Sequence, residues 1–228
     1  MEARQDDSKR NLLIKKEAVP DDMSKYGMPI EQSEVAVVEP EELRIVLAID
    51  VSGSMCGTPM RDAKNAMLSF LEQIDFSSSK VSIVAVANHS IPVAGLTSNK
   101  NECIQAINRV DTVGAGGGNS VHPFDTILST LKNEKGRRYA IILADGVWSY
   151  QDKAIQAAKI CHSNNIETAA IGFGGADYKF LKAISSNDAN ALMVTQEELT
   201  QAFGTIAQSM SNNSNSVDTH TIDTLTWD

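Results

Sequence analysis

Three oxygen-bearing side chains, Asp50, Ser52 and Ser54, follow one another at alternate positions directly after an apolar run. The run, residues 43–49, is rich in Leu, Ile and Val and is typical of a buried strand in a parallel sheet. Where a segment leaves a strand in extended form, alternate side chains lie on one side, so one carboxylate and two hydroxyls can converge. Small oxygen ligands suit a hard cation. The spacing therefore predicts a cation site at the end of this strand.

The residues around these three side chains predict a tight turn that leads into a helix. Gly53 allows the backbone to turn sharply, and Pro59 suits the first turn of a helix. A plainer interpretation is a Ser-rich turn that caps this helix, with Asp50 doing no more than ending the strand. The segments that follow along the chain weigh against this plainer interpretation.

Strands and helices alternate from Leu43 onward. The apolar patterns predict strands over 43–50, 80–87, 91–96, 138–145, 166–173 and 191–195, and helices over 60–74, 101–110, 123–131, 151–164, 177–185 and 197–210. This alternation predicts an α/β fold, a doubly wound, mostly parallel sheet flanked by helices on both faces, with 91–96 as one short antiparallel edge strand. Ligands of such sheets bind beyond the carboxyl ends of the strands, where both Asp50 and Asp145 end a strand.

The sequence Asp-Val-Ser-Gly-Ser-Met at 50–55, at the end of an apolar strand, resembles the metal-ion-dependent adhesion site (MIDAS) of the von Willebrand factor type A (VWA) domain family. The resemblance extends over about 43–210 and implies the Rossmann-like VWA fold. Loops from three places hold the cation in that family: the Asp-x-Ser-x-Ser loop, a Thr after a Gly-rich turn, and an Asp that ends a later strand. The matching metal ligands here are Asp50, Ser52 and Ser54 in the first loop and Asp145 in the third.

The second of these loops departs from the family pattern. Where the family usually has Gly-Gly-Thr, residues 116–120 read Gly-Gly-Gly-Asn-Ser, without a Thr. Ser120 is the favoured replacement ligand because it keeps the hydroxyl, while Asn119 would offer an amide carbonyl instead. Both residues stay candidates, and the change puts in question the affinity of the site and the switching that the family's Thr supports.

The ligand set favours Mg²⁺, with Mn²⁺ as a close substitute and Ca²⁺ as a further candidate. Two aspartates balance the charge of a divalent ion. If one of them binds through a water molecule, the ligands bound directly to the ion carry too little negative charge to balance it. An octahedral Mg²⁺ then keeps a coordination position for the carboxylate of a partner protein's Asp or Glu. This is an adhesion mechanism, and it needs neither a base nor a nucleophile.

Composition bounds the class of protein. The 228 residues include 20 Lys and Arg against 29 Asp and Glu, so the net charge of −9 disfavours nucleic acid and anionic membranes as partners. No apolar run is long enough to span a membrane, and residues 1–10 do not resemble a signal peptide. The cysteines, Cys56, Cys103 and Cys161, are odd in number and far apart, which favours reduced thiols and a cytoplasmic location.

Enzyme classes fit the motifs less well. A haloacid-dehalogenase-type phosphatase needs a second Asp where this chain has Ser52, and the patterns of the phosphate-binding loop and the hydrolase elbow both fail. Cys56 with His89 or His122 would make a thiol enzyme only in a geometry that sequence does not show. His162 and His220 are predicted to be solvated surface residues.

We therefore expect three segments: a polar N-terminal extension (1–42), a VWA-like α/β domain (43–210) and a flexible C-terminal tail (211–228). In the extension, 35–38 could form an edge strand or a packed arm. In the tail, 219–228 could be a recognition peptide or a frayed end. The expected function is that of a non-catalytic, intracellular, metal-dependent protein-interaction module, an adaptor or regulatory subunit of an ATPase, chaperone or stress-response system. The alternatives are a metal-dependent hydrolase or phosphatase that uses Asp50, and a structural domain stabilised by its cation.

Overall fold

The computed structural model of the chain describes residues 42–111 and 118–212. The strand or arm considered for 35–38 and the recognition peptide considered for 219–228 lie outside the described residues. So does nearly all of the predicted extension and tail. The division into three segments therefore stays a prediction.

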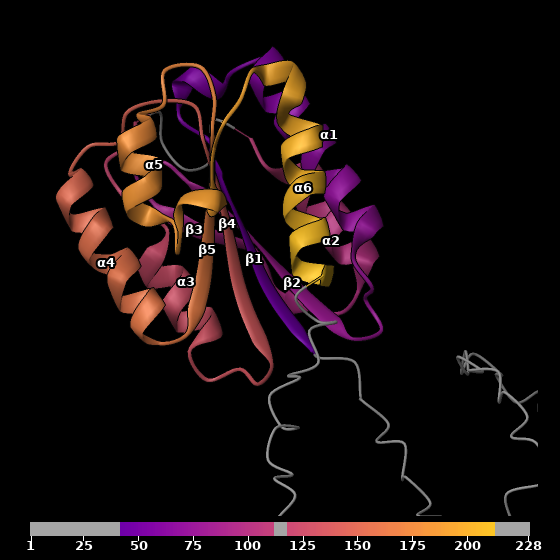
Figure 1. The fold of residues 1–228 in the computed structure, drawn as a ribbon. Helices are drawn as coiled ribbons and strands as arrows, with labels where there is room; N and C mark the ends of the chain where they lie inside the picture. Colours follow the sequence, from indigo (N-terminus) through magenta and orange to yellow (C-terminus); the bar gives the residue numbers. More distant parts are fainter. Residues whose placement is uncertain (1–41, 112–117, 213–228) are drawn as a thin grey trace, which may run out of the picture. The chain divides into compact units, whose positions relative to one another are not determined.

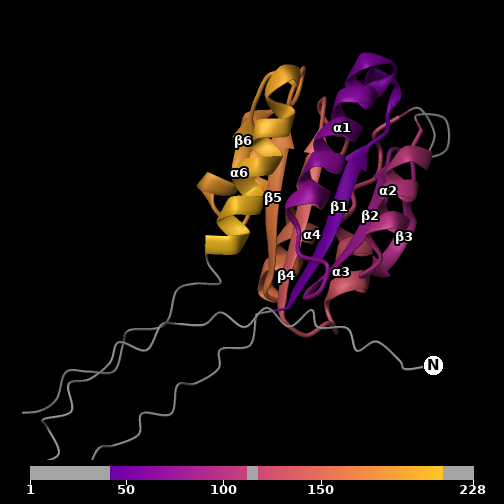
Figure 2. The same cartoon turned by 90° about the vertical axis from the view of Figure 1, so that its right-hand side faces the viewer.

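Six strands form one sheet in the order β3-β2-β1-β4-β5-β6 (Figures 1 and 2). They are β1 (Leu43–Asp50), β2 (Ser79–Val86), β3 (Ser90–Thr97), β4 (Arg137–Ala144), β5 (Ile166–Gly172) and β6 (Ala191–Met193). All neighbouring strands run parallel except β2 and β3, which are antiparallel. The predicted doubly wound, mostly parallel sheet with an antiparallel edge strand is confirmed.

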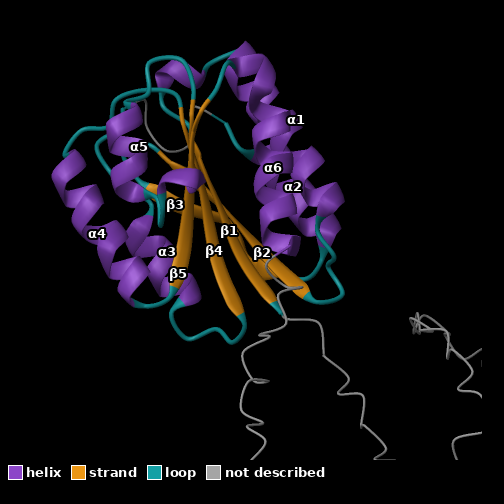
Figure 3. Ribbon diagram, in the orientation of Figure 1, coloured by secondary structure: helices purple, strands orange, loops and turns teal. Residues whose placement is uncertain are grey.

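Helices cover both faces of this sheet (Figure 3). One layer contains α1 (Thr58–Gln73), α2 (Lys100–Arg109) and α6 (Leu199–Asn212); the other contains α3 (Phe124–Leu131), α4 (Gln151–Ser163) and α5 (Tyr178–Ile184). The described residues also contain three short 3₁₀ turns: η2 (Gly53–Met55), η3 (Asp188–Asn190) and η4 (Gln196–Glu198). None of the helices in the described part of the chain is long and apolar enough to cross a membrane.

The central strand β1 is buried on both faces because two hydrophobic cores meet on it. Ile45, Leu47 and Ile49 belong to the core under α1, α2 and α6, whereas Val46 and Ala48 belong to the core under α3, α4 and α5. Successive side chains of a strand point to opposite faces, so an uninterrupted apolar run supplies both cores. Burial of each large aliphatic side chain contributes roughly 1.5–3 kcal/mol, which holds the carboxyl end of β1 firmly in place.

Two elements differ from the sequence prediction in length. The edge strand β3 has eight residues, longer than predicted, and its pairing with β2 shifts register between Val81 and Val84. The strand β6 is shorter, because Thr195 begins a capping box in which its backbone N–H donates to Glu198 Oε2 at 2.9 Å. This box turns the chain into η4 and α6.

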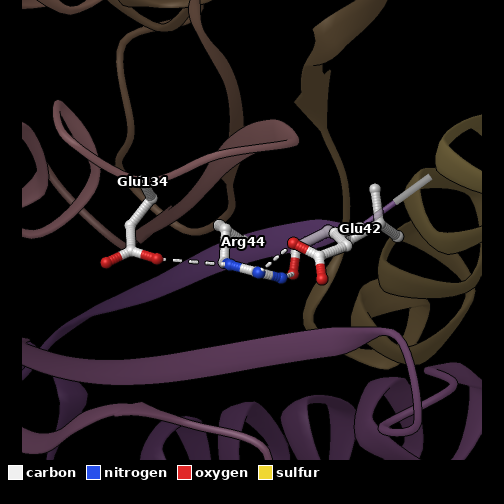
Figure 4. A network of polar contacts seen from close by, with 4 residues as sticks. Glu42, Arg44 and Glu134 are labelled. Atoms are coloured by element: carbon white, nitrogen blue, oxygen red, sulfur yellow. Dashed lines mark hydrogen bonds and ion pairs between the residues drawn. The ribbon is translucent and has the colours of Figure 1, made fainter.

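A buried arginine anchors the amino end of β1 (Figure 4). The Arg44 side chain is only 7% exposed; its Nε donates to Glu134 Oε2 at 3.3 Å and its Nη2 to Glu42 Oε2 at 2.5 Å. Its Nη1 donates to the carbonyl of Leu43 at 3.1 Å. A buried guanidinium is tolerated only when it is paired and hydrogen-bonded. Glu134 therefore ties β1 to the turn before β4, while Glu42 pairs with the guanidinium from the residue directly before β1, at the end of the sheet away from Asp50.

The prediction that His162 is a solvated surface residue is wrong. Its ring is half-buried, and Nε2 lies 2.7 Å from Thr168 Oγ1, which itself donates to the carbonyl of Ile184 at 2.7 Å. Because the Thr168 hydroxyl has one proton, His162 Nε2 is the donor in the first bond. Burial lowers the pKa of His162 below 6.5, against a smaller opposing effect of a hydrogen bond with Ile184.

This burial predicts a pH-dependent stability. A neutral imidazole is favoured in the folded protein, so the free energy of unfolding should fall as the pH drops from 6.5 through the lowered pKa. In His162→Gln this loss should be smaller, and denaturant unfolding over the pH range would measure it. The exposed His89→Gln is the matched control and should leave the slope unchanged. Equal slopes in His162→Gln and the unaltered protein would refute this assignment.

Candidate metal centre

The carboxyl end of β1 carries the first part of the site. Asp50 is the last residue of the strand and is 2% exposed, and one of its carboxylate oxygens, Oδ1, accepts a 2.8 Å hydrogen bond from the backbone N–H of Ser52. Ser52 has an extended backbone (φ −63°, ψ 170°), after which η2 turns the chain toward α1. The 3₁₀ turn after Ser52, and not a continued extended segment, places Ser54 Oγ 3.1 Å from Ser52 Oγ. The predicted convergence of the two hydroxyls is therefore present.

The neighbouring strand β4 supplies the second carboxylate. Asp145 directly follows β4, is 7% exposed, and accepts a 2.9 Å hydrogen bond from Ser54 Oγ at its Oδ1. Its carbonyl accepts the backbone N–H of Gly175 at 2.9 Å, so the loop after β5 also holds this residue in place. The chain passes from β1 to β2 and β3 on one side and to β4 on the other, so Asp50 and Asp145 flank the point where strand order reverses. This reversal is where open α/β sheets bind ligands.

The electrostatics of the two aspartates favour a bound cation. Burial is the main cause that raises the pKa of Asp50 and of Asp145 above 3.8. The charge of Asp145 raises the pKa of Asp50 further. Interactions with Ser52 and Trp148 act against the rise at Asp50, and the hydrogen bond from Ser54 acts against the rise at Asp145. No basic side chain in the described ranges forms an ion pair with either aspartate. Two buried carboxylates beside two hydroxyls fit a divalent, oxygen-preferring ion.

The thiols do not form a second reactive centre. Cys103 and Cys161 are buried, and burial raises their pKa values to about 11 and about 12, so both stay protonated at neutral pH. Cys56 is exposed beside η2, but no hydrogen bond joins it to a histidine in the described part of the chain. The arrangement of a thiol nucleophile with a histidine base is therefore not formed by these residues.

Both candidates in the Gly-rich loop hydrogen-bond to protein groups outside the aspartate–serine cluster. Ser120 is exposed and its Oγ donates to Asn88 Oδ1 at 2.9 Å; Asn119 Nδ2 donates to the carbonyl of Val147 at 2.5 Å. A Cβ at Gly118 would contact the end of the exposed Asn88 side chain, which would have to move to make room for it. Among the described residues, no hydrogen bond joins Asn119 or Ser120 to the four gathered ligands. The choice of Ser120 over Asn119 as a ligand stays a prediction.

Paired alanine substitutions would decide between these two residues. Ser120→Ala should weaken Mg²⁺ binding, because it removes the hydroxyl that replaces the family's Thr. Asn119→Ala should lower the folding stability by only about 1 kcal/mol. The substitution removes two hydrogen bonds: the one from Asn119 Nδ2 to the Val147 carbonyl, and the one that Ser149 Oγ donates to Asn119 Oδ1 at 3.2 Å. Calorimetric titration with Mg²⁺ and denaturant unfolding of both variants would separate the two effects. The reverse ranking of Mg²⁺ affinities would make Asn119 the ligand.

The sequence analysis missed one residue of this site, Trp148. Its side chain is 4% exposed, it acts to lower the pKa of Asp50 against the larger effect of burial, and its ring centre lies 5.5 Å from that of Phe180 in α5. The sequence feature that could have indicated Trp148 is its position, a large aromatic residue three places after Asp145 in the loop that follows β4. Trp148 is therefore buried against α5 in the loop that directly follows Asp145.

The fold and the site together define a doubly wound α/β domain with a cation-binding motif where the strand order reverses. The chain matches the model of the von Willebrand factor type A domain over residues 45–209, and it belongs to this family. The predicted family is thereby confirmed. Domains of this family are generally non-catalytic modules of adhesion or interaction, and their MIDAS binds divalent cations.

Known relatives share the domain rather than the whole chain. A von Willebrand factor A domain-containing protein of Dictyostelium discoideum is 28% identical over 137 residues, a match of 58% of this chain but only 16% of that protein. The vWF domain of the type V pili tip protein Mfa5 from Porphyromonas gingivalis superposes with a TM-score of 0.69 at 10% identity, over 79% of this chain and 98% of that one.

A second solved structure resembles the chain to a similar degree. Proximal thread matrix protein 1 from the mussel byssus, in a structure with a zinc-occupied MIDAS motif, superposes with a TM-score of 0.67 at 18% identity. This match covers 75% of this chain and 46% of the mussel protein. At such identities the likeness to both solved structures shows the fold alone.

Proposed function

We propose that Asp50, Ser52, Ser54 and Asp145, with a residue of the Gly-rich loop, hold one divalent cation, and that this cation binds a carboxylate of a partner protein. One observation carries the proposal: the two buried aspartates are joined through the two serine hydroxyls and have no basic counter-charge among the described residues. A cation supplies the missing positive charge. A coordination position left to water is then open to an acidic side chain of the partner.

Mg²⁺ is the proposed resident ion, with Mn²⁺ as a substitute and Ca²⁺ as a weaker candidate. The gathered side chains offer only carboxylate and hydroxyl oxygens, which hard cations prefer over the nitrogen and sulfur ligands typical of zinc. The zinc in the MIDAS of the mussel protein is consistent with a site of this kind that takes more than one divalent ion. Titration with each ion in turn would rank the affinities, and Mg²⁺ or Mn²⁺ is expected to bind more tightly than Ca²⁺.

The proposed setting is intracellular, as a cytoplasmic adaptor or regulatory subunit of an ATPase, chaperone or stress-response system. The free cysteines support a reducing compartment, because Cys103 and Cys161 are buried thiols without a disulfide. A binding role needs no catalytic group beyond the cation and its ligands. The partner is proposed to present one Asp or Glu within a neutral or basic surface, since this chain has a net charge of −9.

Affinity capture with the full chain would test the proposal. The immobilised protein is exposed to cell extract in Mg²⁺, and the bound proteins are then eluted with EDTA and identified. We expect a partner that EDTA releases, that Asp50→Ala fails to retain, and that loses binding when one of its own acidic residues is replaced. A partner that stays bound in EDTA and binds Asp50→Ala equally well would place the interaction elsewhere on the chain.

A further inference from the structure

The two aspartates of the proposed metal centre are held in different ways. Asp50 is the last residue of β1 and is still paired with Val86 of the neighbouring strand β2. Asp145 lies one residue beyond β4, because the pairing of β4 with β1 ends at Leu143 and its pairing with β5 ends at Ala144. The position of Asp145 therefore depends on contacts outside the sheet.

The loop between β5 and α5 supplies such a contact. The Gly175 N–H donates to the carbonyl of Asp145 at 2.9 Å. Two residues earlier, the Phe173 N–H donates to the carbonyl of Ala144 at 3.1 Å. These two bonds tie the loop to the end of β4 and hold the backbone of Asp145, whose side chain accepts the 2.9 Å hydrogen bond from Ser54.

Gly174 permits this contact through its backbone and through its lack of a side chain. The Ala176 N–H donates to the carbonyl of Phe173 at 3.2 Å, which closes a turn with Gly174 at its second position. Its φ of +60° lies in the left-handed region, which a glycine adopts without strain. A Cβ at Gly174 would lie 3.0 Å from the Asp145 carbonyl oxygen, so the two segments would have to move apart by a few tenths of an ångström.

The other end of the loop is fixed on α5. The Asp177 carboxylate caps this helix, because its Oδ1 accepts the backbone N–H of Lys179 at 2.9 Å and that of Phe180 at 3.4 Å. Leu181 of α5 packs so closely on the end of β5 that a Cβ at Gly172 would collide with it. The loop therefore has little room to retreat, and a new side chain in its turn would displace the end of β4 instead.

A displacement of this size affects one cation more than another. Mg²⁺ requires near-ideal octahedral geometry with ligands at about 2.0–2.1 Å, whereas Ca²⁺ accepts irregular geometry with ligands at about 2.3–2.6 Å. The two ions thus differ in ligand distance by about as much as the shift that a Cβ at Gly174 would impose. Moving Asp145 should therefore lower the affinity for Mg²⁺ more than the affinity for Ca²⁺.

We infer that Gly174 is a positioning residue of the metal centre: it keeps Asp145 in place through the contact of the loop with the Asp145 carbonyl, and it thereby sets the preference of the site for Mg²⁺ over Ca²⁺. This inference rests on the proposed metal-dependent function and specifies how the chain selects its ion. Gly174 acts through Asp145 and is not itself a ligand. Replacing a residue that supports a metal ligand in this way typically lowers metal affinity by about ten- to a hundredfold.

Gly174→Asn in the full chain is the main test. Asn tolerates the left-handed region, so the variant should fold with a melting temperature close to that of the unaltered protein, while its Cβ still presses on the Asp145 carbonyl. In calorimetric titrations the Mg²⁺ affinity should fall about tenfold or more and the Ca²⁺ affinity by a smaller factor. Hydrogen exchange of the Gly175 amide should become faster, because its bond to Asp145 is weakened.

Gly174→Ala is a second variant, which adds backbone strain to the same contact. It should lower the melting temperature by about 2–8 °C and reduce the ratio of Mg²⁺ to Ca²⁺ affinity as Gly174→Asn does.

Gly136→Ala is the matched control for lost stability. Gly136 also has a positive φ, of +83°, and a Cβ there would collide with the carbonyl of Glu42, at the end of the sheet away from Asp50. This variant should lose at least as much stability as Gly174→Ala. It should nevertheless keep both metal affinities and the slow exchange of the Gly175 amide.

The outcomes separate this inference from the proposed function. An unchanged ratio of Mg²⁺ to Ca²⁺ affinity in Gly174→Asn would overturn the role of Gly174 and leave the metal centre standing. An equal change of the ratio in Gly136→Ala would also overturn it, because lost stability and not the position of Asp145 would then lower the affinity. If the unaltered chain bound neither ion, the proposed function and this inference would fall together.

Discussion

The Asp50→Ala variant should bind no Mg²⁺ under conditions in which the unaltered chain binds about one ion. Asp50 supplies one of the two carboxylates in the gathered ligand set, and the loop that contains Ser52 is attached to it through the 2.8 Å bond from the Ser52 N–H. Its loss removes an anionic ligand and frees the loop. Calorimetric titration with Mg²⁺ or Mn²⁺ would measure the effect, and circular dichroism would verify the fold.

The control for this experiment is a carboxylate outside the site. Asp188→Ala removes an exposed aspartate whose ion pair with Lys182 contributes little, so its Mg²⁺ affinity should match that of the unaltered chain. Equal Mg²⁺ affinity in Asp50→Ala would show that the ion binds elsewhere. A loss of Mg²⁺ binding in both variants would point to a diffuse effect of charge instead of a ligand.

Mg²⁺ should raise the stability of the protein in a saturable manner. A ligand that binds only the folded state adds about 2.7 kcal/mol at a hundredfold excess over its dissociation constant. In Asp50→Asn this stabilisation by Mg²⁺ should disappear. Without metal, the variant should be at least as stable as the unaltered protein, because the substitution neutralises one of two buried carboxylates that repel each other. Denaturant unfolding with and without Mg²⁺ would measure both effects; a variant that Mg²⁺ stabilises as much as the unaltered chain would contradict the assignment.

The pH dependence of the metal-free protein follows from the same two groups. Burial raises the pKa of Asp50 and Asp145 in the folded state, so the folded protein holds protons more tightly than the unfolded chain. The stability that these two groups contribute is therefore fully present below the ordinary value of 3.8 and is lost as the pH rises through the raised values. Mg²⁺ should remove most of this loss, since the ion replaces the protons at neutral pH.

Local sequence patterns were sufficient to predict most of the fold. The apolar runs that became β1 and β4 are long, uninterrupted and closed by an aspartate, so their carboxyl ends and the two site aspartates could be located together. The alternate spacing of Ser52 and Ser54 correctly predicted that the two hydroxyls converge, although a 3₁₀ turn and not an extended segment brings them together. The strand ends placed Asp145 at the ligand-binding edge of the sheet, and the family resemblance then assigned it as a metal ligand.

The remaining features depend on contacts between segments far apart in the chain. The short β6 results from a capping box at Thr195, whose Glu198 looked like an ordinary helix residue. The half-buried ring of His162 depends on Thr168 and on α5, which packs beside α4 only in the folded domain. The partners of Asn119 and Ser120 likewise lie in other loops, at Val147 and Asn88. The periodic pattern of apolar residues cannot predict such pairs, because the two residues of a pair are not separated by a regular number of positions in the sequence.

The position of Arg44 has a mechanical consequence. Tension between a partner held at the metal centre and the chain entering at Leu43 would run along the whole length of β1, from the aspartate at one end to the buried guanidinium at the other. β1 is paired in parallel with β2 and β4 on its two edges, so pulling on it shears both ladders. Sheared hydrogen bonds must break together instead of one after another. A pulling force along β1 would therefore load both of its hydrogen-bond ladders at once.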